Sequence, residues 1–109
     1  MSFSSFTKTE ISTLFKQATM RVRSNGLRIM TALSTQQSAR ILIIASRKTG
    51  NAPQRNLFKR RLRSLFYQEK FFEKKVDFIV IADKTGAALS FEKLKELITL
   101  AFTRHGSSH

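Results

Sequence analysis

The side chains in this sequence with the clearest chemical potential are cations, gathered in one short stretch. Residues 46–66 read SRKTGNAPQRNLFKRRLRSLF, in which seven of twenty-one side chains are Lys or Arg and none is Asp or Glu. Such side chains bind phosphate oxygens, and the planar Arg fork can do so with two parallel hydrogen bonds. The stretch therefore predicts a site that binds a polyanion rather than one that breaks or forms bonds.

The net charge of +13 is concentrated in the same part of the chain. Residues 11–68 contain twelve Lys or Arg and no acid, whereas residues 69–109 contain seven basic residues and six acids. Repulsion between like charges destabilises a compact protein unless a partner relieves it. A basic surface kept only for solubility would not require the absence of every acid from so long a segment. We therefore expect a nucleic-acid partner.

Residues that could carry out catalysis are not apparent. The sequence has no cysteine, which excludes disulfides, thiolate metal sites and cysteine nucleophiles. Its two histidines, His105 and His109, fall in the final segment RHGSSH, which we expect to be disordered. The carboxylates of the second half resemble solvated surface charges and show no metal-ligand spacing: Glu69, Glu73, Asp77, Asp83, Glu92 and Glu96. We predict no catalytic and no metal-binding residue in the protein itself.

Length and hydropathy predict one cytoplasmic domain. A chain of 109 residues fits a single domain, which we place at residues 1–104, with a disordered tail at 105–109. No apolar run approaches the ~20 residues that span a bilayer. The first ten residues, MSFSSFTKTE, lack the layout of a secretory signal.

The elements that would position the cations can be predicted from periodicity and capping signals. Thr7 and Glu10 have capping-box spacing at the start of a predicted helix over 8–18. An Asn25-Gly26 turn separates predicted strands at 20–24 and 27–33, and RILIIASR (40–47) and VDFIVIA (76–82) predict two more. Ser90 caps a predicted final amphipathic helix. The order helix, three strands, helix, strand, helix indicates an α+β fold.

The densest cations lie on the predicted middle helix, which begins near Pro53 and ends near Lys70. Its core-facing stripe consists of Phe58, Leu62, Leu65 and Phe66. Beside the stripe run a row of three cations and a second, shorter row: Arg55, Lys59 and Arg63, then Asn56 and Arg60. A basic amphipathic helix can also bind a membrane, but this helix needs its apolar face to cover its own sheet.

The segment before that helix could bind phosphate. Arg47, Lys48 and Asn51 stand where backbone N–H groups at a helix N-terminus attract anions. An ordinary turn in which Asn51 simply caps the helix accounts for the same residues. The two interpretations are compatible.

The stretch SRKTGNAPQRNLFKRRLR resembles the signature of the protein component of bacterial ribonuclease P, typically S-K-K-x-G-N-A-V-x-R-N-R-x-K-R-x-x-R. The matching positions are Ser46, Lys48, Gly50, Asn51, Ala52, Arg55, Asn56, Lys59, Arg60 and Arg63. The flanking elements agree in order, so the resemblance covers nearly the whole chain. Leu57 replaces the second Arg of the family's R-N-R triplet, and Pro53 stands where Val is usual.

The resemblance implies a particular fold. Members of this family form a two-layer sandwich in which an unusual left-handed crossover joins two parallel strands through the signature helix. Physical expectation alone favours the opposite hand, because such crossovers are right-handed in ~98% of cases.

The resemblance also implies a function. In this family the RNA subunit is the catalyst: with Mg²⁺, bound mainly by that RNA, it hydrolyses one phosphodiester of precursor tRNA and releases the 5′ leader. The protein would then have ribonuclease P RNA and precursor tRNA as partners, and neither membrane nor DNA. Its predicted contacts with the RNA subunit are Arg47, Lys48, Asn51, Arg55, Asn56, Lys59, Arg60 and Arg63.

A second predicted surface is a groove for the leader between the first helix and the open face of the sheet. The candidate lining residues are Phe6, Ile11, Phe15 and Met30, with Arg28 nearby. Ile11 and Phe15 could equally be core residues at helical spacing. A ribosomal or other structural RNA-binding protein would share the charge pattern and is the alternative function.

Overall fold

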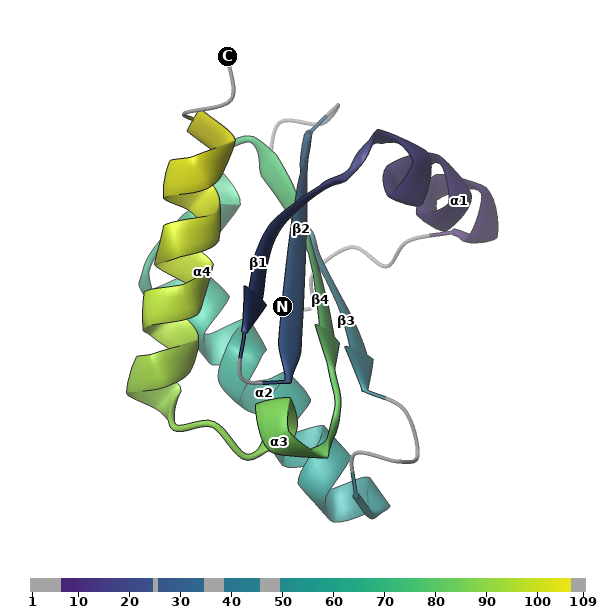
Figure 1. Ribbon diagram of the computed structural model, residues 1–109. Helices are drawn as coiled ribbons and strands as arrows, with labels where there is room; N and C mark the ends of the chain where they lie inside the picture. Colours follow the sequence, from purple (N-terminus) through teal and green to yellow (C-terminus); the bar gives the residue numbers. More distant parts are fainter. Residues whose placement is uncertain (1–6, 25, 35–38, 46–49, 107–109) are drawn as a thin grey trace.

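The mixed α+β fold is confirmed in the computed structural model, which describes residues 7–24, 26–34, 39–45 and 50–106 (Figure 1). The elements in chain order are α1 (Lys8–Gln17), β1 (Thr19–Ser24), β2 (Leu27–Leu33), β3 (Ile41–Ala45), α2 (Ala52–Gln68), the 3-10 turn η2 (Phe71–Glu73), β4 (Val76–Ala82), α3 (Lys84–Ala87) and α4 (Phe91–Gly106). Every predicted helix and strand is present. The short elements η2 and α3 were not predicted.

The four strands form one sheet in the order β1-β2-β4-β3. Strand β2 pairs antiparallel with β1 and with β4, whereas β3 pairs parallel with β4. Val80 lies at the centre of the sheet, opposite Ile29 on one side and Ile43 on the other. The last strand in sequence therefore lies between two earlier ones, and β3 forms an outer edge of the sheet.

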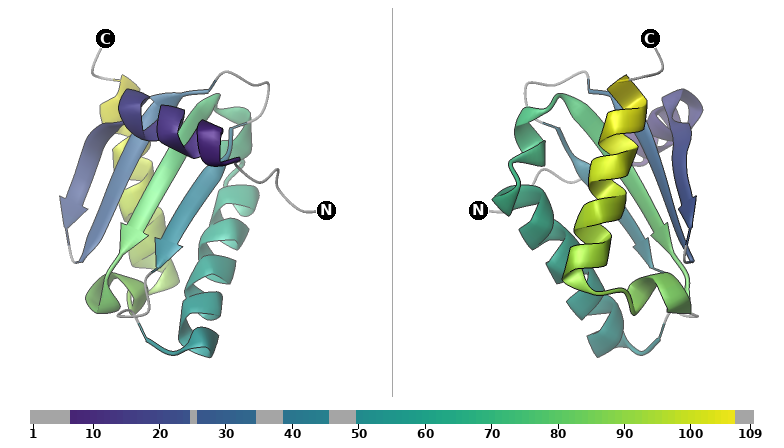
Figure 2. Two further views of the ribbon diagram at one scale, coloured as in Figure 1. Left: turned by 90° about the vertical axis from the view of Figure 1, so that its right-hand side faces the viewer. Right: turned by 60° about the vertical axis from the view of Figure 1, so that its left-hand side comes forward.

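The connection from β3 to β4 runs through α2 and is left-handed. In the left view of Figure 2 both strands run downward, α2 lies on the far side of the sheet, and the chain moves from β3 leftward to β4. This hand is the one that the family resemblance implied. In the same view α2 lies on the side of β3 rather than over the middle of the sheet.

One face of the sheet carries the main hydrophobic core. Helices α2 and α4 pack side by side against this face (Figure 1). Phe58 and Leu62 of α2 are 1% and 0% exposed, and Leu94 and Ile98 of α4 are 0% and 1% exposed. A cluster of rings closes one end of the core, with Phe78 edge-on to Phe66 and Phe71 at centroid distances of 5.8 Å each.

The opposite face is only partly covered, by α1. This helix lies across one end of the sheet and leaves the other end of that face without a helix over it among the described elements (Figure 2, left). Leu14 of α1 packs with Ala32 and Ile79 in a small second core. The predicted two-layer sandwich thus has a partial third layer.

The C-terminal prediction was wrong for residues 105 and 106. Helix α4 continues through Gly106, and His105 Nδ1 lies 2.9 Å from Oγ1 of Thr31. Thr31 is buried on β2 and also accepts a hydrogen bond from Arg21 Nε at 2.9 Å. These polar contacts hold the last turn of the helix against the sheet, so it does not fray. Residues 107–109 lie outside the described part of the chain.

The turn between β1 and β2 supports α3. Gly26 has a φ of +75°, which suits glycine, and its carbonyl accepts a hydrogen bond from the Asp83 N–H at 3.0 Å. Asp83 in turn caps α3 by accepting from the Gly86 N–H at 3.0 Å. A side chain at Gly86 would collide with the backbone of Gly26, so the close fit fixes α3 beside the hairpin.

Candidate nucleic-acid interface

Helix α2 begins with a complete capping box. The side chain of Asn51 accepts from the Gln54 N–H at 3.0 Å, and the side chain of Gln54 accepts from the Asn51 N–H at 3.1 Å. Pro53 stands in the first turn, where its missing N–H costs nothing. Asn51, predicted to contact RNA, therefore has a structural role at the helix start. The other two residues predicted for this segment, Arg47 and Lys48, lie outside the described residues.

The two predicted polar rows of α2 lie on the outside of the helix. Phe58, Leu62, Leu65 and Phe66 are buried as predicted. Asn56, Arg60 and Arg63 are exposed, while Arg55 and Lys59 are half-buried. Residues four apart share one side of a helix, so Arg55, Lys59 and Arg63 form a continuous row. The structure thus presents all five predicted residues on one helix.

No cation of α2 forms an ion pair with an acid within the described part of the chain. The ion pairs between described residues join Arg40 with Glu10, Lys93 with Glu96 and Lys95 with Glu69, and none of them involves α2. The buried Nε of Arg55 has no hydrogen-bond partner among the described residues. Unpaired cations on a rigid helix are ready to bind phosphate oxygens without breaking an existing contact.

The predicted groove corresponds to the partly covered face of the sheet. Met30 is half-buried beside the second core, and Arg28, two residues earlier on the same side of β2, is exposed. On α1 the residue that enters the core is Leu14. Phe15 is 37% exposed and Ile11 is half-buried, so Phe15 is a surface residue rather than a core residue. Phe6 lies outside the described residues.

Three apolar residues of this face were not singled out from the sequence. Leu42 and Ile44 of β3 and Ile81 of β4 are half-buried and pack beside the second core. Ile81 lies opposite both Ile44 and Arg28. The alternation of side chains along VDFIVIA and ILIIA was the available signal, because alternate residues of a strand share one face. Together they make an apolar surface bordered by an exposed cation.

A buried ionic network fastens α1 to the sheet. Nη1 of Arg40 lies 3.0 Å from Oε2 of Glu10, and the Arg40 N–H donates to Oδ1 of Asp77 at 2.8 Å. Arg40 is 7% exposed and Asp77 4% exposed. The interpretation of Asp77 as a solvated surface charge was therefore wrong: its carboxylate sits under α1, where the backbone of the segment before β3 can donate to it.

The two carboxylates of this network are shifted in opposite directions. Burial raises the pKa of Asp77, although the hydrogen bond from the Arg40 N–H partly opposes the increase. Hydrogen bonds from the Thr7 N–H and, secondarily, the Arg40 side chain lower the pKa of Glu10. Glu10 thus stays ionised beside Arg40 over a wide range of pH.

No helix among the described residues is long and apolar enough to cross a membrane. No group of three or more His, Asp or Glu side chains in that part of the chain is placed to hold a metal ion.

Sequence comparison links the chain to one family. The family model described as Ribonuclease P matches residues 6–106. The ribonuclease P protein component of Bacillus velezensis is 39% identical over 69 residues, which cover 63% of this chain and 60% of that protein. The counterpart from a Geobacter species is 28% identical over 90 residues, covering 83% of this chain and 78% of that protein.

Solved structures share the fold. The ribonuclease P protein of Staphylococcus aureus superposes with a TM-score of 0.72 at 22% identity, covering 89% of each chain. The ribonuclease P protein of Thermotoga maritima superposes with a TM-score of 0.69 at 23% identity, covering 83% of this chain and 86% of that one.

Proposed function

The chain belongs to the ribonuclease P protein family, and we propose that it is the protein subunit of a bacterial ribonuclease P. The observation that carries the proposal is α2, where the cations of the family signature form rows that no acid pairs. The enzyme would remove the 5′ leader of precursor tRNA in the cytoplasm. The chain would act as a binding subunit, and the RNA subunit would be the catalyst.

We propose that α2 binds the RNA subunit through its phosphates. Arg55, Lys59, Arg60 and Arg63 supply the charge, and Asn56 supplies a neutral donor and acceptor between them. Each phosphate that a cation neutralises releases counterions, so affinity falls as salt rises. If about five cations of the region from Arg47 to Arg63 make such contacts, the plot of log K against log[salt] has a slope of roughly −3.5 to −4.5.

The partly covered face of the sheet would hold the single-stranded leader. Phe15 and Met30 offer apolar platforms there, with Arg28 beside them as a phosphate partner. Stacking of a base on an aromatic side chain contributes ~1–3 kcal/mol and tolerates any base, which suits leaders of varied sequence. The network of Glu10, Arg40 and Asp77 would keep α1 in place as one wall of this surface.

The Mg²⁺ that the reaction requires would be bound mainly by the RNA subunit. The protein's contribution would be electrostatic, because its charge of +13 offsets the repulsion between a polyanionic substrate and a polyanionic catalyst. Less metal would then be needed to bring the two together.

Cleavage of a 5′-extended precursor tRNA at low Mg²⁺ tests the proposal. The reactions contain the ribonuclease P RNA of the same organism alone, the protein alone, or both. We expect cleavage only when both are present, together with a lower Mg²⁺ requirement than that of the RNA alone. Tight RNA binding without any stimulation would contradict the proposal and favour a ribosomal or other structural RNA-binding role.

A further inference from the structure

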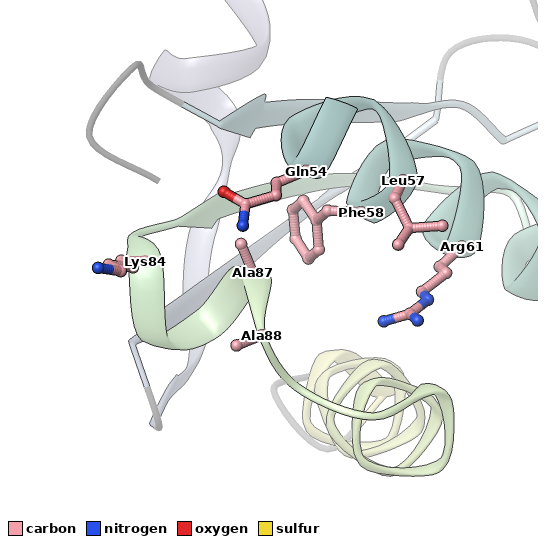
Figure 3. A pocket seen from close by; sticks show the side chains of 7 residues that line it. All are labelled: Gln54, Leu57, Phe58, Arg61, Lys84, Ala87 and Ala88. Atoms are coloured by element: carbon pink, nitrogen blue, oxygen red, sulfur yellow. The ribbon is translucent and has the colours of Figure 1, made fainter. Parts of the chain in front are cut away.

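A small pocket lies between α2 and α3, on the side of α2 away from the row of Arg55, Lys59 and Arg63. It has a volume of about 240 Å³. Its walls come from two elements: Gln54, Leu57, Phe58 and Arg61 of α2, and Lys84, Ala87 and Ala88 of α3 and its end. Figure 3 shows Gln54 beside the apolar side chains in the middle, with Arg61 at one end and Lys84 at the other, the amino group of Lys84 on the side away from Phe58.

The lining combines apolar surface with positive charge and contains no acid. The nearest acid in sequence, Asp83, is occupied in capping α3. Such a site would repel a cationic ligand. A purely apolar ligand would make no use of the charges of Arg61 and Lys84. The complementary ligand has a flat apolar body with negative groups on either side of it, which is the description of a nucleotide within an RNA strand.

The size of the pocket further limits which ligands it can hold. Pockets that bury drug-sized molecules measure ~300–1,000 Å³. A pocket of about 240 Å³ that is open to solvent therefore suits a single ring system, with the attached sugar and phosphates outside. One unstacked base fits this description, whereas a base pair or a folded peptide does not.

Leu57 distinguishes this chain from the family signature at the same place. The signature has a second Arg in its R-N-R triplet, and here a leucine that is 42% exposed forms the outer wall of the pocket. A large exposed apolar side chain amid cations has no part in the hydrophobic core. It adds exposed apolar surface to the pocket where the signature has a cation.

We propose that the pocket binds one unstacked nucleotide of the RNA subunit, with the base against Leu57 and Ala88 and the flanking phosphates on Arg61 and Lys84. The choice of the RNA subunit rests on the proposed function, since the pocket is built on the same helix as the predicted contacts with that RNA. The chemistry itself, one base with a phosphate on either side, does not depend on that function.

A titration of the isolated protein tests the chemistry. Backbone amide NMR signals are followed while adenosine 5′-monophosphate or, separately, ribose 5-phosphate is added. We expect saturable shifts at Leu57, Ala87 and Ala88 with the nucleotide, and affinity roughly tenfold lower for ribose 5-phosphate, which lacks the base. Equal affinity for the two compounds would show recognition of phosphate alone and would overturn the proposal.

Leu57→Ser provides the variant, and Leu100→Ser is its matched control, because Leu100 is similarly exposed (37%) but lies on α4. Both substitutions keep the charge. We expect Leu57→Ser to weaken nucleotide binding roughly tenfold, because apolar contact area is lost, and Leu100→Ser to leave it unchanged. An unchanged spectrum elsewhere confirms that each variant is folded. Equal binding by both variants and the wild type would contradict a role for the pocket.

Chemical probing of the RNA in the assembled complex identifies the partner. We expect one unpaired base of the ribonuclease P RNA to be protected by the wild type and by Leu100→Ser, and exposed again with Leu57→Ser. Protection of a base only in precursor tRNA would overturn the choice of partner. If the wild type stimulates cleavage but no base depends on Leu57, the pocket proposal fails while the proposed function stands. If the wild type does not stimulate cleavage, the proposed function and the choice of RNA partner both fail, and the titration alone decides whether the pocket binds a nucleotide.

Discussion

At the scale of single residues, the neighbours of each charge determine what it can do. The cations of α2 have no acidic partner in the ion pairs described, whereas Arg40 lies between two carboxylates and is almost fully buried. An unpaired surface cation gives up only water when it binds phosphate. Arg40 would have to leave Glu10 behind, so we assign it to the structure and the α2 cations to binding.

The first prediction concerns the directions in which two carboxylate pKa values are shifted. Burial raises the pKa of Asp77, and hydrogen bonds from the Thr7 N–H and the Arg40 side chain lower the pKa of Glu10. We therefore expect Asp77 to titrate above an unfolded Asp, and Glu10 to titrate below an unfolded Glu. Carbon-13 NMR of the side-chain carboxyls measures both values. An Asp77 that titrates at or below the ordinary value would mean that solvent reaches its carboxylate.

The signs of the linked stabilities follow from these shifts. Because the folded pKa of Glu10 lies below its unfolded value, Glu10 stabilises the fold above that unfolded value, and this contribution is lost as pH falls through the folded pKa. Asp77 acts in the other direction: its raised pKa makes the folded protein bind a proton more readily, so its cost at neutral pH is relieved on acidification.

The second prediction separates charge from other contributions to RNA binding. Replacing Lys59 or Arg63 by Gln should each reduce the magnitude of the log K against log[salt] slope by ~0.7–0.9, because each removes about one phosphate contact. Filter binding to the ribonuclease P RNA over a series of salt concentrations measures the slope. Lys95→Gln on α4, which removes a cation already paired with Glu69, should leave it nearly unchanged. A parallel decrease with this control would point to net charge rather than to α2.

At the scale of elements, α1 is held by few contacts and is the element most easily released. Its only residue in the described core is Leu14, and its ionic link to the body of the protein is Glu10 with Arg40. The helix itself is stabilised locally by the Thr7 capping box. It can therefore remain helical while losing its place over the sheet.

The third prediction tests that link. Arg40→Met removes the guanidinium but keeps the backbone N–H that bonds Asp77 and much of the apolar stem. We expect faster amide hydrogen exchange in α1 with no change in α2 or α4. Affinity for precursor tRNA relative to leaderless tRNA should fall roughly tenfold, the equivalent of about one stacked base.

Lys93→Met is the control for this variant, because it breaks only the exposed pair of Lys93 with Glu96. It should alter neither exchange in α1 nor the preference for the leader. If Arg40→Met weakens precursor and leaderless tRNA equally, α1 has no part in holding the leader.

Features of the structure that depend on residues close together in the sequence could be predicted, and features that depend on distant residues could not. The Thr7 capping box, Pro53 and the apolar stripe of α2 are local signals, and they located α1 and α2 to within a few residues. The burial of Asp77 depends on Arg40, 37 positions away, and the last turn of α4 on Thr31, 74 positions from His105. No pattern in either segment reveals such a partner. Helix α3 has four residues, too few to show a period.

The hand of the crossover could not be obtained from local patterns either. Sterics favour the right-handed connection, and only the family signature indicated the left-handed one. One part of the candidate interface was predictable from local patterns and the other was not. The rows of α2 follow from helical spacing, whereas Leu42, Ile44 and Ile81 meet only because β3 and β4 pair in parallel.

At the scale of the whole molecule, the dominant feature is a large positive charge on a small domain. The chain carries +13 within a radius of gyration of 12.9 Å. Repulsion at this density opposes folding, and dissolved salt screens it within a Debye length of ~10 Å at 0.1 M. The free protein is therefore expected to be less stable than its complex with RNA.

The fourth prediction follows from this repulsion. Raising NaCl from low to moderate concentration should raise the Tm of the free protein, by roughly 4–8 °C for each kcal/mol of repulsion screened. The triple variant Lys59→Gln, Arg60→Gln, Arg63→Gln should have a higher Tm at low salt and a flatter dependence. Thermal unfolding followed by circular dichroism measures both. A Tm that falls with salt would show that attractive ion pairs outweigh repulsion.

The position of β3 at the outer edge of the sheet has a consequence for behaviour in the test tube. The strand ILIIA is short, apolar and half-buried, and one of its two edges is unpaired within the described sheet. An apolar edge strand of this kind can pair with the same strand of another copy and so start aggregation. The cationic helix α2, which follows β3, opposes this pairing, because two β3 edges can approach only if the positive charges of their α2 helices also come together. Stripping charge from α2 should therefore cause aggregation as well as weaken RNA binding.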